Sequence, residues 1–381
     1  MTSQHSILLT AILSTALTAC GGSSSSSSAP EALKTQSPLA ELGLNCVAVD
    51  KAVDVADDGI LQLALVDSYF SGSDFATSSA EIVSYDSCSD HLYVVNSQAA
   101  SIDVLELSSN NSAPSKVGTI DLSLAATSAG IEIGAANSVS AKQGLVAVAI
   151  EAKVKQNPGL IALYRSDDLS LLGTYSAGAL PDMVTLSSDG QTILTANEGE
   201  PNGDYSVDPE GSITIVDISK GYAEKAEVKQ VSFAAFNLGQ ARHAELSMGV
   251  RTAGPDGTSV AQDLEPEYMA LNSDNTKAYV ALQENNAIID IATARVDSIK
   301  GLGEKSWNVA SGNKLDASNK ANGVGEFASY EQLVGLYMPD TIARFSVDGA
   351  DYIISANEGD GREYIYSATQ QVCEAAEHSW D

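Results

Sequence analysis

Three segments of this chain repeat one pattern, and that repeat limits the folds that the chain can adopt. The segments are LPDMVTLSSDGQTILTANE at 180–198, LEPEYMALNSDNTKAYVALQE at 264–284 and MPDTIARFSVDGADYIISANE at 338–358. Each segment has Pro followed by an acidic residue near its start and continues with alternating apolar and polar residues, as in a strand. It then turns at Asp-Gly or Asp-Asn and ends in an amide residue followed by Glu. The 16, 17 and 18 residues from Pro to amide are the spacing that a β-hairpin requires.

Two fainter copies precede these three, at residues 81–97 and 137–151. A third apolar run follows four of the five copies, as SIDVLEL, GLIALYR, SITIVDI and AIIDIA. Repeats of about 50 residues with three or four short antiparallel strands are typical of propeller blades. We therefore predict an all-β fold, a β-propeller of four-stranded antiparallel blades, with a β-sandwich as the alternative.

About five blades are visible, and the last copy stops after its second strand, so the ring is predicted to be incomplete. Inserts are expected at about 220–263 and 299–335, and residues 59–70 are expected to supply a closing strand. Helical periodicity is confined to SSAEIVSY at 78–85 and YEQLVGLY at 330–337. The propeller domain is assigned to residues 41–381.

The N-terminus resembles a bacterial lipoprotein signal. Residues 1–20 hold a short apolar run that ends in LTAC, so we expect cleavage before Cys20 and lipidation of Cys20. An ordinary cleavage site is the alternative, because residues 1–5 contain no Lys or Arg. Residues 21–40 are Ser-rich and are expected to form a flexible tether. Gly21 follows Cys20, and this residue at that place in lipoproteins favours sorting to the outer membrane. We therefore expect the protein at the outer membrane or cell surface.

Three further cysteines follow Cys20, and an oxidising compartment permits disulfides. We predict a bridge between Cys46 and Cys88, which leaves Cys373 as an odd thiol. That odd thiol indicates a partner beyond residue 381, as in a truncated chain.

The formal charge of −30, from 50 acids and 20 bases, argues against nucleic acid and against anionic lipid surfaces as partners. Contact with a membrane is therefore expected through the N-terminal lipid only. The chain has four His, which leaves little material for a His-based zinc site or a Ser-His-Asp triad. No catalytic residue is assigned.

The hairpin geometry predicts one shared site. In an antiparallel pair, the residues before the first strand and after the second strand emerge at the same end. If the first strand of each blade is innermost, the acids and amides of all repeats converge on one face. The candidate metal ligands are Asp182, Asn197, Glu198, Glu200, Glu267, Glu284, Asp340, Asn357, Glu358 and Asp360.

Calcium is the cofactor that this set favours, because hard cations prefer carboxylate and amide oxygens. The loop EGEPNGD at 198–204 resembles the start of a calcium loop but lacks the rest of the EF-hand pattern. The alternative is that these residues only form turns. Arg251 and Arg362 lie close to the motifs and are candidates for binding an anionic group or for pairing with the acids.

Long stretches of the chain resemble the choice-of-anchor I family of bacterial surface β-propellers. The resemblance rests on LPDMVTLSSDGQTILTANEGEP, QDLEPEYMALNSDNTKAYVALQENNA and YMPDTIARFSVDGADYIISANEGDGREY, and it covers about 45–365. The family is similar to YVTN-type propellers and to the mesenchyme-specific cell surface glycoprotein. It implies an exported, tethered protein with about seven blades when complete, and some members carry an alkaline phosphatase label.

Three functions from different classes follow. The first is a lipid-anchored binding or adhesion protein of the bacterial envelope with a calcium-binding acidic face and an unidentified extracellular or periplasmic ligand. The second is a metal-dependent phosphoesterase, which needs metal at the acidic face and an Arg for phosphate. The third is a structural envelope protein.

Overall fold

The computed structural model describes residues 46, 65, 67–74, 77, 79–107, 113–292, 294–318, 325–359 and 361. The predicted signal segment, the tether and Cys20, Asp360, Arg362 and Cys373 lie outside the described residues. In the described part, no helix is long and apolar enough to span a membrane.

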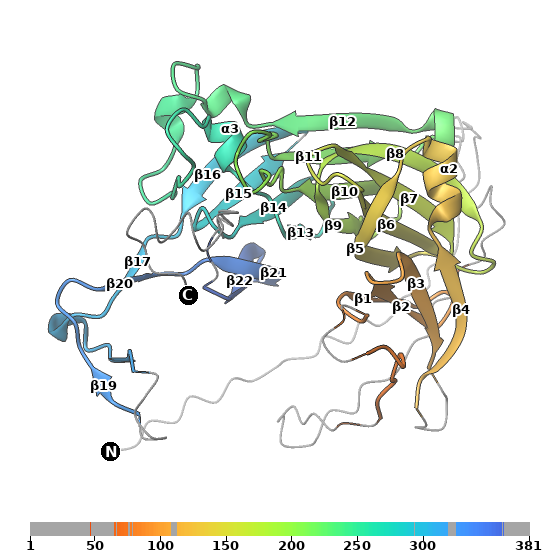
Figure 1. Cartoon of the computed structure of the whole chain (residues 1–381), viewed down its shortest axis with the longest axis horizontal. Helices are drawn as coiled ribbons and strands as arrows, with labels where there is room; N and C mark the ends of the chain where they lie inside the picture. Colours follow the sequence, from red (N-terminus) through yellow and green to blue (C-terminus); the bar gives the residue numbers. More distant parts are fainter. Residues whose placement is uncertain are drawn as a thin grey trace, which may run out of the picture. The chain divides into compact units, whose positions relative to one another are not determined.

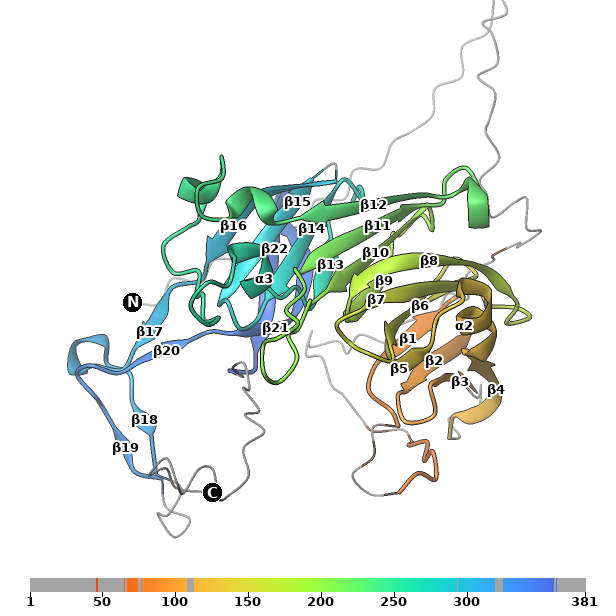
Figure 2. The ribbon, with the colours of Figure 1, turned by 45° about the horizontal axis from the view of Figure 1, so that its top comes forward.

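Four antiparallel sheets follow one another along the chain, each with four strands in sequence order (Figures 1 and 2). Blade 1 holds β1 (Val83–Asp86), β2 (His91–Asn96), β3 (Ser101–Glu106) and β4 (Ser115–Asp121). Blade 2 holds β5 (Ile133–Lys142), β6 (Leu145–Ala152), β7 (Pro158–Arg165) and β8 (Leu171–Ala179). Blade 3 holds β9 (Pro181–Leu186), β10 (Thr192–Asn197), β11 (Ser212–Asp217) and β12 (Glu227–Ser232). Blade 4 holds β13 (Met269–Leu271), β14 (Lys277–Leu282), β15 (Ala287–Ala292) and β16 (Arg295–Gly301).

A fifth unit, blade 5, has two strands in the described chain, β21 (Pro339–Val347) and β22 (Ala350–Asn357). Its face with Phe345, Val347, Tyr352 and Ile354 is exposed, and the rings of Phe345 and Tyr352 stack at 5.4 Å. The five predicted repeats are therefore confirmed as β-hairpins, and the four predicted third strands are β3, β7, β11 and β15. This architecture is that of successive β-propeller blades.

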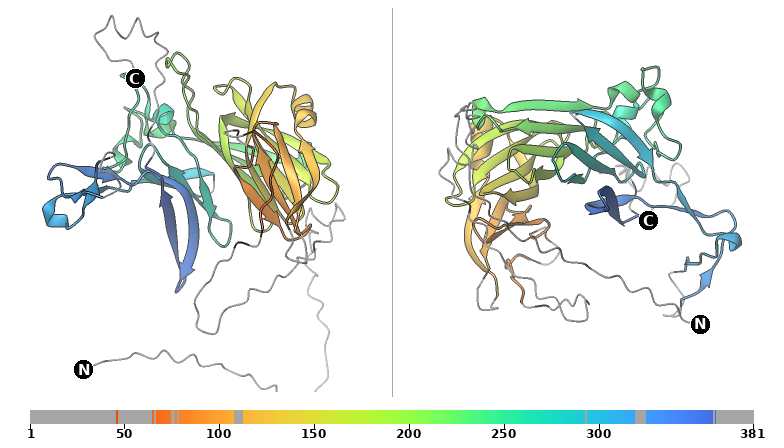
Figure 3. Two further views of the ribbon diagram at one scale, coloured as in Figure 1. Left: turned by 60° about the horizontal axis from the view of Figure 1, so that its bottom comes forward. Right: turned by 180° about the vertical axis from the view of Figure 1, so that it is seen from behind.

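Two inserts interrupt the blades close to their predicted positions. The first follows β12 and contains α3 (Val260–Asp263) and 3₁₀ turns at Ala234–Phe236 and His243–Glu245. The second is an arm that projects from the sheets (Figure 3); it holds β17 (Glu304–Ser306), β18 (Leu315–Asp316), β19 (Phe327–Ala328) and β20 (Val334–Leu336). The fourth strand of blade 3, β12, lies inside the range predicted as the first insert.

The two segments with helical periodicity, 78–85 and 330–337, overlap strands β1 and β20. Pairing with a neighbouring strand overrides a single turn of helical periodicity. Of the α-helices in the described residues, the longer is α2 (Ser123–Ala129), which ends where Gly130 adopts a left-handed conformation with φ of 69°. Residues 65 and 67–70 are not in a strand, and the rest of the predicted closing strand lies outside the described residues.

In the described part of the chain, the core forms three apolar layers, each between two successive blades. All eight residues of β6 are buried, and its alternate side chains serve two layers. Val146, Val148 and Ile150 pack with blade 1, whereas Leu145 and Ala147 pack with blade 3. A third layer joins blade 3 to blade 4. The near-continuous apolar runs of these strands therefore reflect burial on both faces.

The first strands of the blades pack against one another in order. β5 contacts β1 and β9, and β13 contacts β9 and β21. These contacts place the first strands innermost, which is the condition under which the hairpin ends of the repeats share one face.

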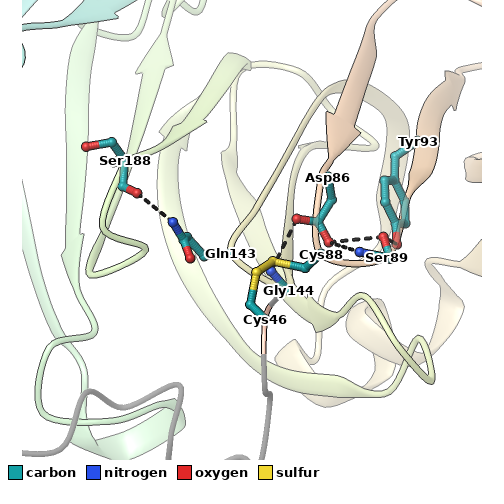
Figure 4. The surroundings of a disulfide bond; sticks show 8 residues. All are labelled: Cys46, Asp86, Cys88, Ser89, Tyr93, Gln143, Gly144 and Ser188. Atoms are coloured by element: carbon teal, nitrogen blue, oxygen red, sulfur yellow. Dashed lines mark hydrogen bonds between the residues drawn. A yellow bond between two sulfur atoms is a disulfide. The ribbon is translucent and has the colours of Figure 1, made fainter. Parts of the chain in front are cut away.

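The hairpin turns at the other end of the blades are joined by side chains. Asp86, which is fully buried, accepts hydrogen bonds from the backbone and hydroxyl of Ser89 and from the Gly144 backbone N–H (Figure 4). The Gln143 amide donates to the Ser188 carbonyl at 3.1 Å, and the Asn275 amide donates to the Ser188 hydroxyl at 3.0 Å. The predicted Cys46–Cys88 disulfide is present at this end, with a Cα–Cα distance of 4.9 Å. Turns of four blades are thus connected in series.

Candidate functional site: an acidic cluster at one end of the blades

Each first strand begins with an irregularity that carries a polar residue. In blade 3, Pro181 pairs with Asn197 and Met183 pairs with Ala196, so Asp182 is an extra residue. In blade 2, Ala136 pairs with Ile150 and Ser138 pairs with Ala149, so Asn137 is an extra residue, and a second register shift lies between Ile133 and Ala136. A β-bulge changes the direction of the side chain of its extra residue. The polar side chain at the bulge therefore does not follow the alternation of the other side chains of the strand.

Blades 1, 4 and 5 show the same irregularity. The Val95 carbonyl accepts a hydrogen bond from the Glu81 N–H, and the Val95 N–H donates to the Ile82 carbonyl. In the same way, the Ala281 carbonyl accepts from the Glu267 N–H, and the Ala281 N–H donates to the Tyr268 carbonyl. Near Asp340, the register of β21 shifts by one residue against β22. The bulge residues Glu81, Asn137, Asp182, Glu267 and Asp340 therefore occupy equivalent places in five blades.

We call the carboxylates at this end of the blades the acidic cluster. It is defined by carboxylates that act on one another electrostatically: Glu81, Asp182, Glu198, Glu200, Glu265, Glu267, Glu284 and Asp340. The field at Asp182 comes from Asp340 of blade 5 and Glu81 of blade 1 as well as from Glu284 of blade 4. Carboxylates from four blades thus converge at one end, as the hairpin geometry predicts.

Burial and mutual repulsion disfavour the charged forms of three of these groups. Burial and then the charge of Asp340 raise the pKa of Asp182 to about 7. Burial and then the charge of Glu284 raise the pKa of Glu267 to about 10. The pKa of Glu198 lies well above its ordinary value, because of burial and then the charges of Asp182 and Glu267. By whole-residue surface area, all three residues are half-buried.

The amide that precedes Glu198 is built into the sheet. Asn197 is fully buried, and its Nδ2 donates to the Ser212 carbonyl at 3.1 Å and to the Thr214 hydroxyl at 3.0 Å. Its Oδ1 accepts no hydrogen bond from the described part of the chain. The side chain of Asn197 therefore ties β10 to β11 and keeps one buried oxygen available as an acceptor.

The last repeat contributes less than predicted. Asn357 and Glu358 are exposed, and Glu358 accepts a hydrogen bond at 3.2 Å from the amide of Gln283. The hydroxyl of Ser355 donates to Asn357. Neither Asn357 nor Glu358 is among the charges and dipoles that act most strongly on the three raised carboxyl groups.

Sequence reasoning missed three charged residues of this end. Glu81 holds the bulge position of blade 1, and an alignment of the first repeat with the later ones contains that signal. Glu265 is 3% exposed and lies two residues before Glu267. Lys155 follows β6 on the loop 153–157, and no feature of the repeat indicates it.

Arg251 is held near the cluster by its backbone and its guanidinium. Its Nη1 donates to the Glu284 carbonyl at 3.0 Å, and its N–H donates to the Asn285 carbonyl at 2.7 Å. The buried carboxylate of Asp263 accepts from the backbone N–H groups of Ala253 and Gly254, both at 2.8 Å. The loop that carries Arg251 is therefore fixed against blade 4.

In the part of the chain that the structure describes, no three His, Cys, Asp or Glu side chains are close enough together to hold one metal ion. A calcium ion would need ligands in addition to these carboxylates, such as amide oxygens, carbonyl oxygens and water, which calcium accepts readily.

The sequence matches the profile of the choice-of-anchor I domain over residues 81–380. The chain belongs to the choice-of-anchor I family. This choice-of-anchor I protein is a surface-associated β-propeller, which agrees with the resemblance found in the repeats. No functionally curated protein matches its sequence.

Several solved structures are similar in outline. A functionally unknown protein from Desulfotomaculum acetoxidans shares 11% identity with a TM-score of 0.38, over 70% of this chain and 59% of that chain. The Cps50 (Swd1) β-propeller domain from Myceliophteria thermophila shares 7% identity with a TM-score of 0.37, over 68% of this chain and 74% of that chain. The choice-of-anchor I chain thus spans less than two thirds of the first of these proteins.

Proposed function

We propose that this protein is a lipid-anchored binding protein of the bacterial cell envelope, and that its acidic cluster binds calcium. The observation that carries the calcium proposal is the convergence of eight carboxylates from four blades on one end. Such a cluster is costly to ionise near neutral pH unless a cation neutralises it.

The ligand chemistry supports calcium over softer metals. The groups at this end are carboxylates and amides, and the buried Oδ1 of Asn197 beside Glu198 has no hydrogen-bond donor among the described residues. Oxygen ligands favour hard cations such as calcium and magnesium. Calcium accepts irregular ligand sets more readily than magnesium does, which suits a cluster built from several loops.

The test is thermal unfolding of the full chain with excess CaCl₂ or with EGTA. Calcium at ~100 times its dissociation constant is expected to add about 2.7 kcal/mol to the free energy of unfolding. The double variant Glu198→Gln/Glu267→Gln should lose most of that gain, whereas Glu106→Gln, at the other end of blade 1, should keep it. A wild type whose Tm is the same in calcium and in EGTA would refute the calcium proposal.

The anchor is proposed from the sequence around Cys20. A protein that begins at a lipidated Cys20 should incorporate radiolabelled palmitate and fractionate with the outer membrane. The Cys20→Ser variant should incorporate none. Equal labelling of both proteins, or a soluble and unlabelled wild type, would exclude the lipid anchor.

A further inference from the structure

The outer edge of blade 2 differs from the outer edges of the other four-stranded blades. Because the first strands are innermost, the fourth strands β4, β8, β12 and β16 form the outer edges (Figure 2). An exposed edge offers unpaired N–H and C=O groups, and charged side chains on it keep other strands from pairing. Three edges carry such side chains: Lys116 and Asp121 on β4, Glu227 and Lys229 on β12, and Arg295, Asp297 and Lys300 on β16. The sequence of β8, LLGTYSAGA, contains no charged residue.

The backbone of β8 is also less covered than that of β16. Arg242 of the first insert donates from its guanidinium to the carbonyls of Val296 and Asp297 on β16, at 2.6 and 3.0 Å. Within the described residues, the main chain of 171–178 has no hydrogen-bond partner outside its own blade. The side chain that bonds to it is the Ser176 hydroxyl, which donates to the next carbonyl at 3.4 Å. In the described chain, this edge is therefore open to a further strand.

A groove lies on each side of β8. The groove towards α2 has a volume of about 550 Å³, and its lining includes Ile131 and Leu160. The groove towards β12 has a volume of about 500 Å³, and its lining includes Val228. Thr174 and Ser176 line both grooves, so the two grooves meet at the exposed edge of the strand.

An open edge between two grooves suits the addition of a strand. An extended peptide beside β8 would exchange backbone hydrogen bonds with its edge, and the side chains of such a peptide alternate between the two faces of the sheet. One set of side chains would enter the groove towards α2, and the other set would enter the groove towards β12. The nine residues of β8 span about 30 Å, which is long enough for several such hydrogen bonds.

We propose that the outer edge of β8 binds an extended peptide segment of a basic partner protein, which adds to blade 2 as a fifth strand. The middle of this segment is uncharged, because apolar side chains and the hydroxyls of Thr174 and Ser176 line the grooves. Its flanks are basic, because the formal charge of the chain is −30 and Glu224 lines the groove towards β12; complementary charge steers association. This interaction does not depend on the binding of calcium.

The probe that tests this interaction is the end-capped peptide KTVTVTVTK. Its matched control is the same peptide N-methylated at every Val and Thr, which keeps the side chains and the charge but lacks the backbone donors that strand addition needs. Binding to the full chain is measured by fluorescence polarisation in ~0.15 M NaCl, which screens long-range attraction. The first peptide should bind and the N-methylated peptide should not. Hydrogen exchange should slow in residues 171–178 and stay unchanged in β4.

Two protein variants locate the site. Thr174→Lys gives β8 the kind of charge that the other edges carry, and it should weaken binding of the peptide by about ten-fold through repulsion of the basic flanks. Thr119→Lys places the same charge on β4, another outer strand, and should keep the wild-type affinity. The variant Ser176→Lys, at an exposed residue of β8, repeats the test if Thr174→Lys lowers Tm.

Four outcomes would overturn the proposal. Equal binding of the two peptides, or protection outside residues 171–178, would mean that net charge alone attracts the probe. Absence of binding at about 1 mM peptide would exclude the site. Residues 171–178 that are already protected without peptide would show that another segment of this chain occupies the edge. A dimer of the wild type that Thr174→Lys dissociates would assign the edge to a second copy of the chain.

Discussion

Individual carboxyl groups of the acidic cluster work against the stability of the folded protein. The pKa of Glu267 is raised to about 10 and that of Asp182 to about 7. A carboxyl group whose pKa is raised by folding favours the unfolded state once the pH exceeds its ordinary value, because the unfolded chain releases the proton and the folded chain retains it. The arrangement is therefore the opposite of a stabilising salt bridge.

The substitution Glu267→Gln should stabilise the protein. The amide preserves the shape of the side chain but removes the ionisation, so at pH 8 we expect a gain of about 1–2 kcal/mol in the free energy of unfolding. The gain should vanish near pH 4, where the carboxyl group is protonated in both states. Urea unfolding at the two pH values checks this, with Glu106→Gln as the control at the opposite end of blade 1. A loss of stability at pH 8 would contradict the repulsion.

The repeat predicts some residues of the acidic cluster and gives no signal for others. Asp182, Glu198, Glu267, Glu284 and Asp340 follow from antiparallel pairing alone, because a hairpin brings its two ends together whatever its exact length. Lys155 was not predictable, because its position depends on the path of a loop and on a contact with the next blade. The exposure of Glu358 was not predictable either, because it depends on which other segments pack against blade 5.

Among the structural elements, the loop from β10 to β11 positions the cluster by close packing. A Cβ on Gly211 would lie 1.9 Å from the Leu264 carbonyl oxygen and 2.9 Å from the Glu198 carbonyl oxygen. Only a residue without a side chain lets this loop approach the segment that carries Glu265 and Glu267. The glycine therefore sets the spacing between the acids of blades 3 and 4.

The substitution Gly211→Ala should destabilise the protein by roughly 1–3 kcal/mol, because two backbone segments must separate. It should also weaken any calcium effect on Tm, since the acids of the two blades move apart. Gly361→Ala is the control, because a Cβ there meets no atom of the described residues within 4 Å. Equal melting of the two variants would show that the loop relaxes without cost.

Strands were easier to predict than helices in this chain. Alternating apolar residues and Asp-Gly turns specify hairpins locally, and the five hairpins follow them. The helix α2 is only seven residues long, Ser123–Ala129, and its clearest signal is the terminal Gly130. The sequence of 78–85 contains an apolar spacing that suits a helix, but Val83 pairs with Val94 in blade 1.

At the scale of the whole molecule, the disulfide joins the N-terminal segment to the first blade across a sequence separation of 42. In the chain-entropy account, a loop of this length corresponds to about 4 kcal/mol. The double variant Cys46→Ser/Cys88→Ser should therefore lose roughly 2–4 kcal/mol in the free energy of unfolding. The hairpin that carries Cys88 should remain folded, because the buried carboxylate of Asp86 holds Ser89 and Gly144 independently.

Chemical denaturation under oxidising conditions gives the stability, and hydrogen exchange of residues 83–96 reports on the hairpin. Wild-type protein in a dithiol reductant should match the double variant. If exchange in β1 and β2 becomes as fast as in an unfolded chain, the disulfide is needed for the hairpin itself and the role of Asp86 is smaller than we infer.

The net charge of the molecule and the acidic cluster together predict the pH dependence of its stability. The formal charge is −30, and the raised pKa values of Asp182, Glu198 and Glu267 make the folded state bind more protons than the unfolded state above about pH 4. Stability from these groups therefore falls as pH rises from about 4 to 10. Below pH 4 the sign reverses, because Asp351 and Asp167 have pKa values lowered by hydrogen bonds from Arg344 and Arg165.

We therefore expect Tm in EGTA to be highest on the acidic side of neutrality, near pH 5, and to fall towards pH 9. Raising NaCl from 0.05 to 0.5 M (a change of conditions, with Debye lengths from ~14 to ~4 Å) should raise Tm more at pH 9 than at pH 5, because more of the repelling charge is present at pH 9. Differential scanning calorimetry over pH 3–9 measures both effects. A Tm that rises steadily from pH 5 to pH 9 at low salt would mean that the carboxylates of the cluster are already neutralised by the protein itself, and the need for a bound cation at this end of the blades would disappear.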